Sequence, residues 1–271
     1  MYETIRTERR GNIGVVILNR PEVHNAFNAV LVAELNAVFD AAAKDDSLHA
    51  VVLTGSGPSF CAGADTHWMR GMAKASQLDN REDSLQLARL MRQLNYLDKP
   101  TIARVNGAAY GGGVGLIACC DVAIGVDSAK FALSEVKLGI VPAVISRYVV
   151  DAIGLRQARR LFVTGEVFDA QDAVNFGLLH EAVPADALDD RVREIVHRLS
   201  KAGPRARRLA KRLALRVADR DEREQTKLDT ENAELIARIR VSEEGQEGLG
   251  AFLDKRKPAW IDDQKETEKE A

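Results

Sequence analysis

Short runs of apolar, often β-branched residues that end in turn residues recur along the chain and indicate β-strands. The clearest are "IGVVILN" (13–19), "AVVLTG" (50–55) and "TIARV" (101–105). We predict further short strands at 121–125, 130–133 and 179–183.

Apolar residues at helical spacing lie between these strands. Between the first two strands, the spacing holds for Leu31, Val32, Leu35, Val38, Phe39 and Ala42. A second helix is predicted over about 82–97, before Pro100, and a third begins near Gly112. The alternation of strands and helices predicts an α/β fold of stacked layers, although no fixed sequence period is present.

The pattern changes to helices alone from about residue 186. One helix, "GPRARRLAKRLALR", starts after a Gly-Pro break at 203–204, and a last helix ends before Pro258. We therefore place a domain boundary near residue 195, with a core over 1–195 and a C-terminal helical region over 196–271.

Composition narrows the class of protein. The chain has 271 residues, 46% of them hydrophobic, which is enough for a sizeable core. Its formal charge is −2, so it has no strong general attraction to nucleic acid or to an anionic membrane. No apolar run has the length of a secretory signal or a membrane span, and we expect a cytoplasmic protein. Two of the three cysteines, Cys119 and Cys120, are interpreted as small buried apolar residues rather than a redox pair.

Residues 191–220 are locally basic, with eleven Lys or Arg against two acids. Basic and apolar residues alternate there at helical spacing, and aromatic residues for base stacking are missing. This pattern favours a solvated or intersubunit helix face, while RNA binding stays the alternative from a different class of function.

Two glycine-rich loops follow strands. "NGAAYGGGVGLIACCD" (106–121) leads into a helix, whose first amides are unpaired and attract negative charge. "TGSGPSFCAGAD" (54–65) also leaves a strand and precedes a helix. If both loops face one cleft, an amide from each could bind one carbonyl oxygen as it becomes an oxyanion.

The glycines are compatible with two other interpretations. Small residues could merely allow close packing of a helix on a strand. Gly113, Gly115 and Ala118 also fit the dinucleotide pattern G-x-G-x-x-A, with Glu135 twenty residues after Gly115. In that fingerprint the first glycine turns directly off the strand, whereas residues 106–112 intervene here. We expect no metal site, because ligand spacing is missing around the five histidines, His24, His49, His67, His180 and His197.

Six segments, in order along the chain, resemble the crotonase (enoyl-CoA hydratase) superfamily. They are "LNRPEVHNAFN" (18–28), "FCAGAD" (60–65), "KPTIARVNGAAYGGG" (99–113), "CDVAIGVDSAKFALSEVKLGIVP" (120–142), "TGEVFDAQDAVNFGLLHEAV" (164–183) and "FLDKRKPAW" (252–260). The resemblance implies a crotonase-type spiral of ββα units followed by C-terminal helices that trimerise, giving a homotrimer or a homohexamer. It implies an acyl-CoA thioester as substrate and no separate cofactor, since coenzyme A is part of that substrate.

The resemblance also implies roles for individual residues. The amides of Ala64 and Gly112 correspond to the oxyanion hole, and Glu135 corresponds to a catalytic glutamate. The positions expected to contact substrate or coenzyme A are Ala62, Gly63, Ala64, Asp65, Thr66 and Gly112, with Phe252 and Lys255 contributed from a neighbouring subunit.

One expected carboxylate is missing. Hydratases of this family usually carry a second glutamate two residues after the third glycine, where this chain has Gly115. With Glu135 alone, one group must serve both proton transfers in turn, or another group must help. We expect Gly115→Glu to restore the pair and to favour straight-chain substrates.

The long segments 115–154 and 236–260 most resemble bacterial methylglutaconyl-CoA hydratases of leucine breakdown and the related isovaleryl-CoA route. The predicted activity is that of a hydro-lyase that hydrates 3-methylglutaconyl-CoA or dehydrates 3-hydroxy-3-methylglutaryl-CoA. Another crotonase activity, such as a general enoyl-CoA hydratase or isomerase, is the alternative. The distal carboxylate of such a substrate asks for a cation or hydrogen bonds, and the candidates are His67, Arg70, Arg147 and Tyr148.

Overall fold

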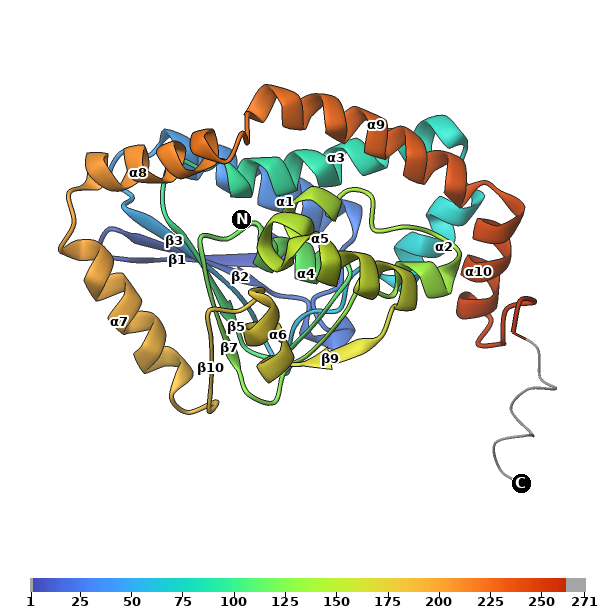
Figure 1. Cartoon of the computed structure of the whole chain (residues 1–271), viewed down its shortest axis with the longest axis horizontal. Coiled ribbons are helices and arrows are strands. Elements are labelled where there is room, and N and C mark those ends of the chain that lie inside the picture. The colour runs from blue at the N-terminus through green and yellow to red at the C-terminus, as the bar shows by residue number, and fades with distance from the viewer. Residues whose placement is uncertain (1, 262–271) are drawn as a thin grey trace.

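The computed structural model describes residues 2–261 and contains two β-sheets enclosed by helices (Figure 1). The larger sheet has the order β1-β2-β3-β5-β7-β10, and the smaller has the order β4-β6-β8-β9. The strands are β1 (Ile5–Arg10), β2 (Ile13–Leu18), β3 (Ala50–Gly55), β4 (Ser59–Cys61), β5 (Thr101–Val105), β6 (Ala108–Tyr110), β7 (Val122–Val126), β8 (Lys130–Ala132), β9 (Val167–Asp169) and β10 (Glu181–Val183).

Helices connect the strands and form the C-terminal part of the described chain. They are α1 (Ala29–Lys44), α2 (Thr66–Lys74), α3 (Gln77–Asn95), α4 (Gly112–Ala118), α5 (Ser146–Thr164), α6 (Ala170–Phe176), α7 (Leu188–Ser200), α8 (Pro204–Val217), α9 (Glu222–Arg240) and α10 (Glu243–Leu253). Two short 3-10 helices, η1 (Pro21–Val23) and η2 (Ser134–Leu138), complete the set.

From β3 to β8, successive strands alternate between the two sheets. β3, β5 and β7 are parallel neighbours in the larger sheet, and β4, β6 and β8 are parallel neighbours in the smaller one. Parallel neighbours need a crossover connection, which the intervening segments with α3 and α4 provide. Each of these turns of the chain therefore adds one strand to each sheet, followed by α2 and α3 in the first turn and by α4 in the second. This is the spiral of ββα units that the resemblance implied.

The predicted elements are present with small shifts of their ends. The strands at 50–55 and 101–105 have the predicted bounds, and the strand expected at 179–183 is shortened to Glu181–Val183. The helix predicted over 82–97 begins earlier, because Ser76 and Asp79 form a reciprocal capping box at its start. Its apolar stripe, like that of α1, is buried against the core.

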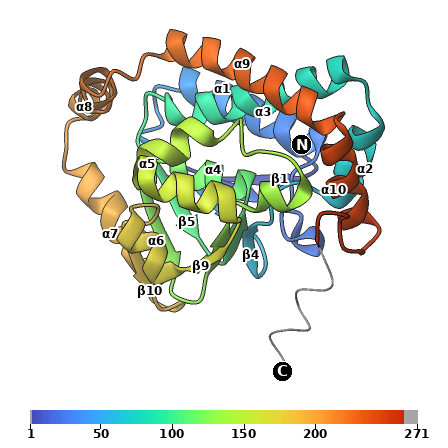
Figure 2. The same cartoon turned by 45° about the vertical axis from the view of Figure 1, so that its right-hand side comes forward.

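The last helices return to the spiral core. α9 lies along α3, and α10 lies near α2 (Figures 1 and 2). Residue 195 falls inside α7, and the division into 1–195 and 196–271 stays a prediction. Within residues 2–261, helices long and apolar enough to cross a membrane are absent.

The basic stretch 191–220 begins within α7 and continues through helix α8. Three of its cations form ion pairs with acids of the core, at Arg208–Asp46, Lys211–Asp121 and Arg212–Asp98. These pairs fit the interpretation of a solvated helix face, while an intersubunit face and the RNA-binding alternative stay predictions. Three apolar side chains of this helix, those of Leu209, Leu213 and Val217, are exposed. The homotrimer or homohexamer implied by the resemblance stays a prediction.

Candidate active site

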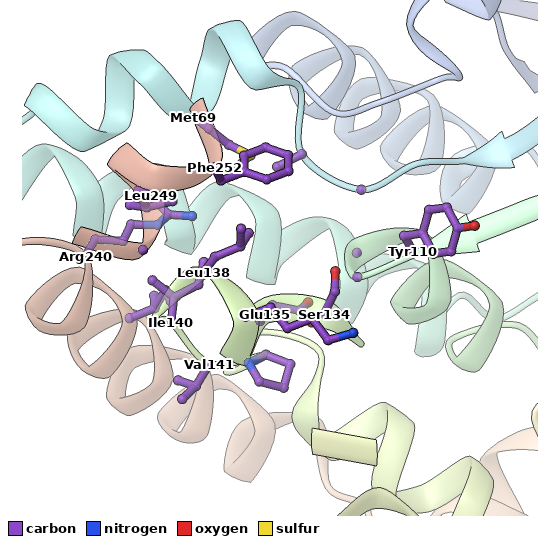
Figure 3. A pocket seen from close by; sticks show the side chains of 18 of the residues that line it. Met69, Tyr110, Ser134, Glu135, Leu138, Ile140, Val141, Arg240, Leu249 and Phe252 are labelled. Carbon is purple, nitrogen blue, oxygen red and sulfur yellow. The ribbon is translucent and has the colours of Figure 1, made fainter. Parts of the chain in front are cut away.

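A pocket of about 600 Å³ lies where the two glycine-rich loops meet η2 and the last helices (Figure 3). Its walls are mostly apolar, with side chains from α2, η2, α9 and α10. Of the positions that the sequence predicts for the site, Ala62, Gly63, Ala64, Gly112, Glu135 and Phe252 line this pocket. Asp65, Thr66 and Lys255 are not among its lining residues.

The first loop presents the amide of Ala64. Phe27 donates its N–H to the carbonyl of Gly63 at 2.7 Å and accepts from the N–H of Asp65 at 2.8 Å. These two bonds involve the residues on either side of Ala64. The N–H of Ala64 itself donates no hydrogen bond to a described residue. Gly63 has φ +84°, and a Cβ there would lie 3.0 Å from the carbonyl oxygen of Tyr110. The backbones of the two loops are therefore in direct contact.

The second loop presents the amide of Gly112. Gly111 has φ +51° and donates its N–H to the carbonyl of Ala132 at 2.9 Å, while Gly112 begins α4. A residue in the first turn of a helix has no intrahelical acceptor for its N–H. The fold thus brings two unused amides, from loops 48 positions apart at Ala64 and Gly112, to one pocket. The oxyanion hole assigned to them stays a prediction.

Glu135 lies on η2, just after β8, with its side chain directed into the pocket (Figure 3). The residue is half-buried, but its Oε2 atom is completely buried and has no hydrogen-bond partner among the described residues. Burial raises the pKa of Glu135 to about 7. A Cβ at Gly111 would lie 2.9 Å from Oε1, so the glycine leaves room for the carboxyl group. Within residues 2–261, Glu135 is the one acid that lines the pocket.

Gly115 is not among the residues that line the pocket. A Cβ at this position would lie 2.3 Å from Cγ2 of Ile145 and 3.4 Å from Cε of Met91. Ile145 does line the pocket, so its side chain covers position 115. The segment "PAVISR" (142–147), which contains Ile145, therefore forms the pocket wall directly at the position of the missing carboxylate.

Asp65 has a structural role instead of a place in the pocket. It caps α2 by accepting the N–H of His67 at 2.7 Å, and it forms a buried ion pair with Arg20 at 2.7 Å. Burial raises the pKa of Asp65, but these contacts outweigh burial and leave the pKa below its usual value. The side chain thus anchors the loop that presents Ala64. Thr66 and Lys255 are exposed.

The four candidates for a distal carboxylate, His67, Arg70, Arg147 and Tyr148, do not line the pocket. Arg147 lies near Asp151, with Nε 3.9 Å from a carboxylate oxygen. A different cation, Arg240 of α9, reaches the pocket wall. It was missed because its ion-pair partner, Asp83, lies 157 positions away in the sequence.

The cysteines lie apart from the pocket lining. Cys61 and Cys119 are buried and Cys120 is half-buried. Burial raises the pKa of all three thiols, to about 12 for Cys61 and Cys120. Thiolates are the reactive form, so these residues behave as small apolar side chains, as the sequence predicted for Cys119 and Cys120. Groups of three or more metal-binding side chains are absent from the described part of the chain.

Comparison with known proteins identifies the family of this chain. The enoyl-CoA hydratase/isomerase family matches residues 8–264. A crotonyl-CoA hydratase of Syntrophomonas wolfei is 33% identical over 265 residues, which cover 96% of this chain and 98% of the relative. A hydroxycinnamoyl-CoA hydratase-lyase of Pseudomonas fluorescens is 35% identical over 216 residues, covering 78% and 77%.

A solved structure gives the same result. The crystal structure of an enoyl-CoA hydratase from Shewanella pealeana superposes with a TM-score of 0.78 at 41% identity, covering 95% of this chain and 96% of that one. The predicted crotonase fold and the predicted hydro-lyase class are thereby confirmed. Because sequence and structure agree over nearly the whole length, this chain belongs to the enoyl-CoA hydratase/isomerase family, the crotonases.

Proposed function

We propose that this enzyme adds water reversibly to a branched 2-enoyl-CoA through a single carboxylate, and that its substrate pair is 3-methylglutaconyl-CoA and 3-hydroxy-3-methylglutaryl-CoA. The observation that carries the proposal is the position of Glu135. Its unpartnered Oε2 belongs to the same pocket as the unused amides of Ala64 and Gly112. The position where a second glutamate is usual is glycine, covered by Ile145.

The two amides bind the thioester carbonyl oxygen. As water adds to C3, negative charge develops on this oxygen, and each preorganised donor lowers the barrier by about 3 to 4 kcal/mol. The ionised Glu135 takes a proton from the attacking water while the new C3–O bond forms. The protonated carboxyl group then delivers a proton to C2 of the enolate. Glu135 returns to its ionised form, and the net change is the addition of one water.

A pKa near 7 suits this double role. A group that must both accept and release a proton works best when its pKa is close to the pH at which the enzyme operates. Burial of Glu135 raises its pKa to about 7 from the usual 4.5. An ordinary surface glutamate, with a pKa near 4.5, would be a much weaker base toward water in the first step.

Two observations support the branched substrate. The segments 115–154 and 236–260 resemble methylglutaconyl-CoA hydratases. Ile145 reshapes the wall at position 115. The names of the relatives cover more than one reaction, including a hydratase-lyase, so substrates must decide.

The direct test is a panel of acyl-CoA thioesters followed by the loss or gain of the enoyl absorbance. The panel contains 3-methylglutaconyl-CoA, 3-hydroxy-3-methylglutaryl-CoA, 3-methylcrotonyl-CoA and crotonyl-CoA. We expect kcat/KM to be highest for the first pair. Equal turnover of crotonyl-CoA contradicts the substrate assignment but leaves the reaction class standing. Double-bond migration without hydration contradicts the reaction class.

A further inference from the structure

The acyl end of the pocket contains one buried cation that none of the predicted roles uses. Arg240, the last residue of α9, lines the pocket beside Leu249 and Leu138. In Figure 3 it lies on the far side of Glu135 from Tyr110, away from the second glycine-rich loop. An acyl chain held by its thioester at the loops and passing Glu135 therefore points toward this guanidinium.

Partners on α3 hold one nitrogen of the guanidinium in place. Nη1 donates to Oδ1 of Asn80 at 3.2 Å and lies 3.3 Å from Oδ2 of Asp83. Asn80 is itself fixed, because its amide donates to the carbonyl of Met72 at 3.0 Å. Trp68, which lines the pocket, donates its indole N–H to Asp83 at 3.1 Å. The arginine is thus oriented by a polar cluster, Arg240, Asp83, Asn80 and Trp68.

The cluster leaves donors for a ligand. Both bonds from Arg240 to described residues use Nη1, whereas a guanidinium has five N–H donors and can bind a carboxylate with two of them. Burial lowers the pKa of Arg240, and burial raises the pKa of Asp83, although the two groups are paired. Both shifts indicate that the attraction between the two charges does not fully offset the free-energy cost of removing them from water. A further acceptor from the pocket side would add to that compensation.

The other two cations of the pocket wall are placed differently. Arg256 is 47% exposed and donates through both Nη atoms to Glu247, at 2.6 and 2.7 Å. Lys137 is exposed, and its side chain lies beside Gly165, with Cε 3.2 Å from a Cβ built there. The side chain of Arg240 is only 15% exposed and lies on the pocket wall beside Leu249 and Leu138.

We propose that Arg240 is the specificity-determining residue of the acyl pocket, and that its Nη2 and Nε donors bind a carboxylate at the far end of the acyl chain. The inference deepens the proposed function and rests on it for the identity of the natural substrate. The subsite itself is defined by chemistry alone, as a place for acyl-CoA thioesters that carry a second carboxylate.

The test uses unreactive thioesters, so that binding is measured apart from turnover. Glutaryl-CoA and butyryl-CoA differ by one terminal carboxylate, and each is used as a competitive inhibitor of the full-length enzyme. We expect the wild type to bind glutaryl-CoA about 10- to 100-fold more tightly, as one charge-assisted contact allows. Arg240→Met removes this preference. The matched control Arg238→Met, which changes an exposed arginine of the same helix, retains it.

Asp83→Asn separates ligand binding from a purely structural ion pair. If Arg240 binds the ligand carboxylate, loss of the competing Asp83 charge preserves or increases the preference for glutaryl-CoA. If the pair only ties α9 to α3, Asp83→Asn and Arg240→Met weaken both inhibitors alike and lower the thermal stability alike. That result overturns the proposal, as does a wild type that binds both thioesters equally.

Failure of the proposed function would look different. If 3-methylglutaconyl-CoA is not hydrated but glutaryl-CoA binds through Arg240, the subsite stands and the substrate assignment falls. If 3-methylglutaconyl-CoA is hydrated equally well by wild type and Arg240→Met, the assignment stands and the subsite falls.

Discussion

Ile145 occupies the space that any side chain at position 115 would need, because a Cβ on Gly115 would lie 2.3 Å from its Cγ2 atom. The two positions are thirty residues apart in the sequence, on α4 and immediately before α5. The absence of a carboxylate at position 115 and the presence of Ile145 are therefore linked by one contact in the pocket wall.

The contact between Ile145 and position 115 changes the expected effect of Gly115→Glu on activity and stability. From the sequence, this substitution alone was expected to favour straight-chain substrates. With Ile145 in place, the new side chain has no room, and we expect a loss of stability of about 1 to 3 kcal/mol and no gain in activity. Gly115→Glu combined with Ile145→Gly should instead raise kcat for crotonyl-CoA, by roughly 100-fold if the carboxylate is well positioned. Steady-state kinetics and thermal unfolding provide both measurements.

Ile145→Gly alone is the control for that experiment. It opens the same space without adding a carboxylate, so it should not gain activity toward crotonyl-CoA. An equal gain in the single and the double variant would show that space, not a second acid-base group, limits the straight-chain reaction.

Glu135→Gln should abolish most of the turnover while the protein stays folded. The amide keeps the size of the side chain but cannot take a proton from water. A positioned acid or base contributes roughly 100- to 10,000-fold, and we expect a fall in kcat of at least about 100-fold. Circular dichroism checks the fold, and the acyl-CoA assay measures the loss. A decrease of only a few-fold would mean that another group, such as the substrate carboxylate, shares the proton transfers.

The pH dependence of the rate should report the same group. Addition of water starts from the ionised form of Glu135, whose pKa is raised to about 7 by burial. We therefore expect kcat/KM to rise about tenfold per pH unit below 7 and to level off above it. A profile measured with a saturable substrate between pH 5 and 9 tests this. A plateau that already extends down to pH 5 would show that the carboxyl group titrates near its ordinary value.

Stability should depend on pH in the opposite direction. The folded pKa of about 7 lies above the unfolded value of 4.5, so the folded state binds more protons between these limits. The contribution of Glu135 to stability is therefore lost as the pH rises from 4.5 to 7, and it stays lost above that range. At pH 8, Glu135→Gln should unfold at a higher temperature than the wild type. Its free energy of unfolding should be larger by roughly 1 to 3 kcal/mol. The difference in stability between this variant and the wild type should be smaller at pH 5. An equal difference at both pH values would contradict the raised pKa of Glu135.

Gly112→Val should abolish turnover through displacement of the amide at the start of α4. A Cβ at Gly112 would lie 2.8 Å from Cε2 of Phe27, a fully buried residue whose backbone also pairs with the Ala64 loop. Both amides should therefore shift, and a loss of roughly 100- to 1,000-fold in kcat is expected from one displaced donor. Gly71→Val is the matched control, because nothing lies within 4 Å of a Cβ at that helical glycine. Near-wild-type turnover of Gly112→Val would place the anion hole elsewhere.

The sequence by itself determined the local elements and part of the site. β-Branched runs such as 50–55 and 101–105 became strands because their apolar side chains have a buried place on both faces of a parallel sheet. The glycine runs identified both loops, since close backbone approach and a positive φ, as at Gly63 and Gly111, favour glycine. The resemblance supplied Glu135, and the structure places it in the pocket with the amides of both loops.

Only the tertiary structure decided which distant residues meet. Asp65, which was expected to contact coenzyme A, forms an ion pair with Arg20 and caps the start of α2. The cations proposed for a distal carboxylate lie outside the pocket lining, and Arg240 reaches it because α9 packs along α3. Periodicity and motifs record the neighbours of a residue along the chain. Contacts such as Gly115 with Ile145, or Arg240 with Asp83, depend on how whole elements pack, and local patterns do not specify that packing.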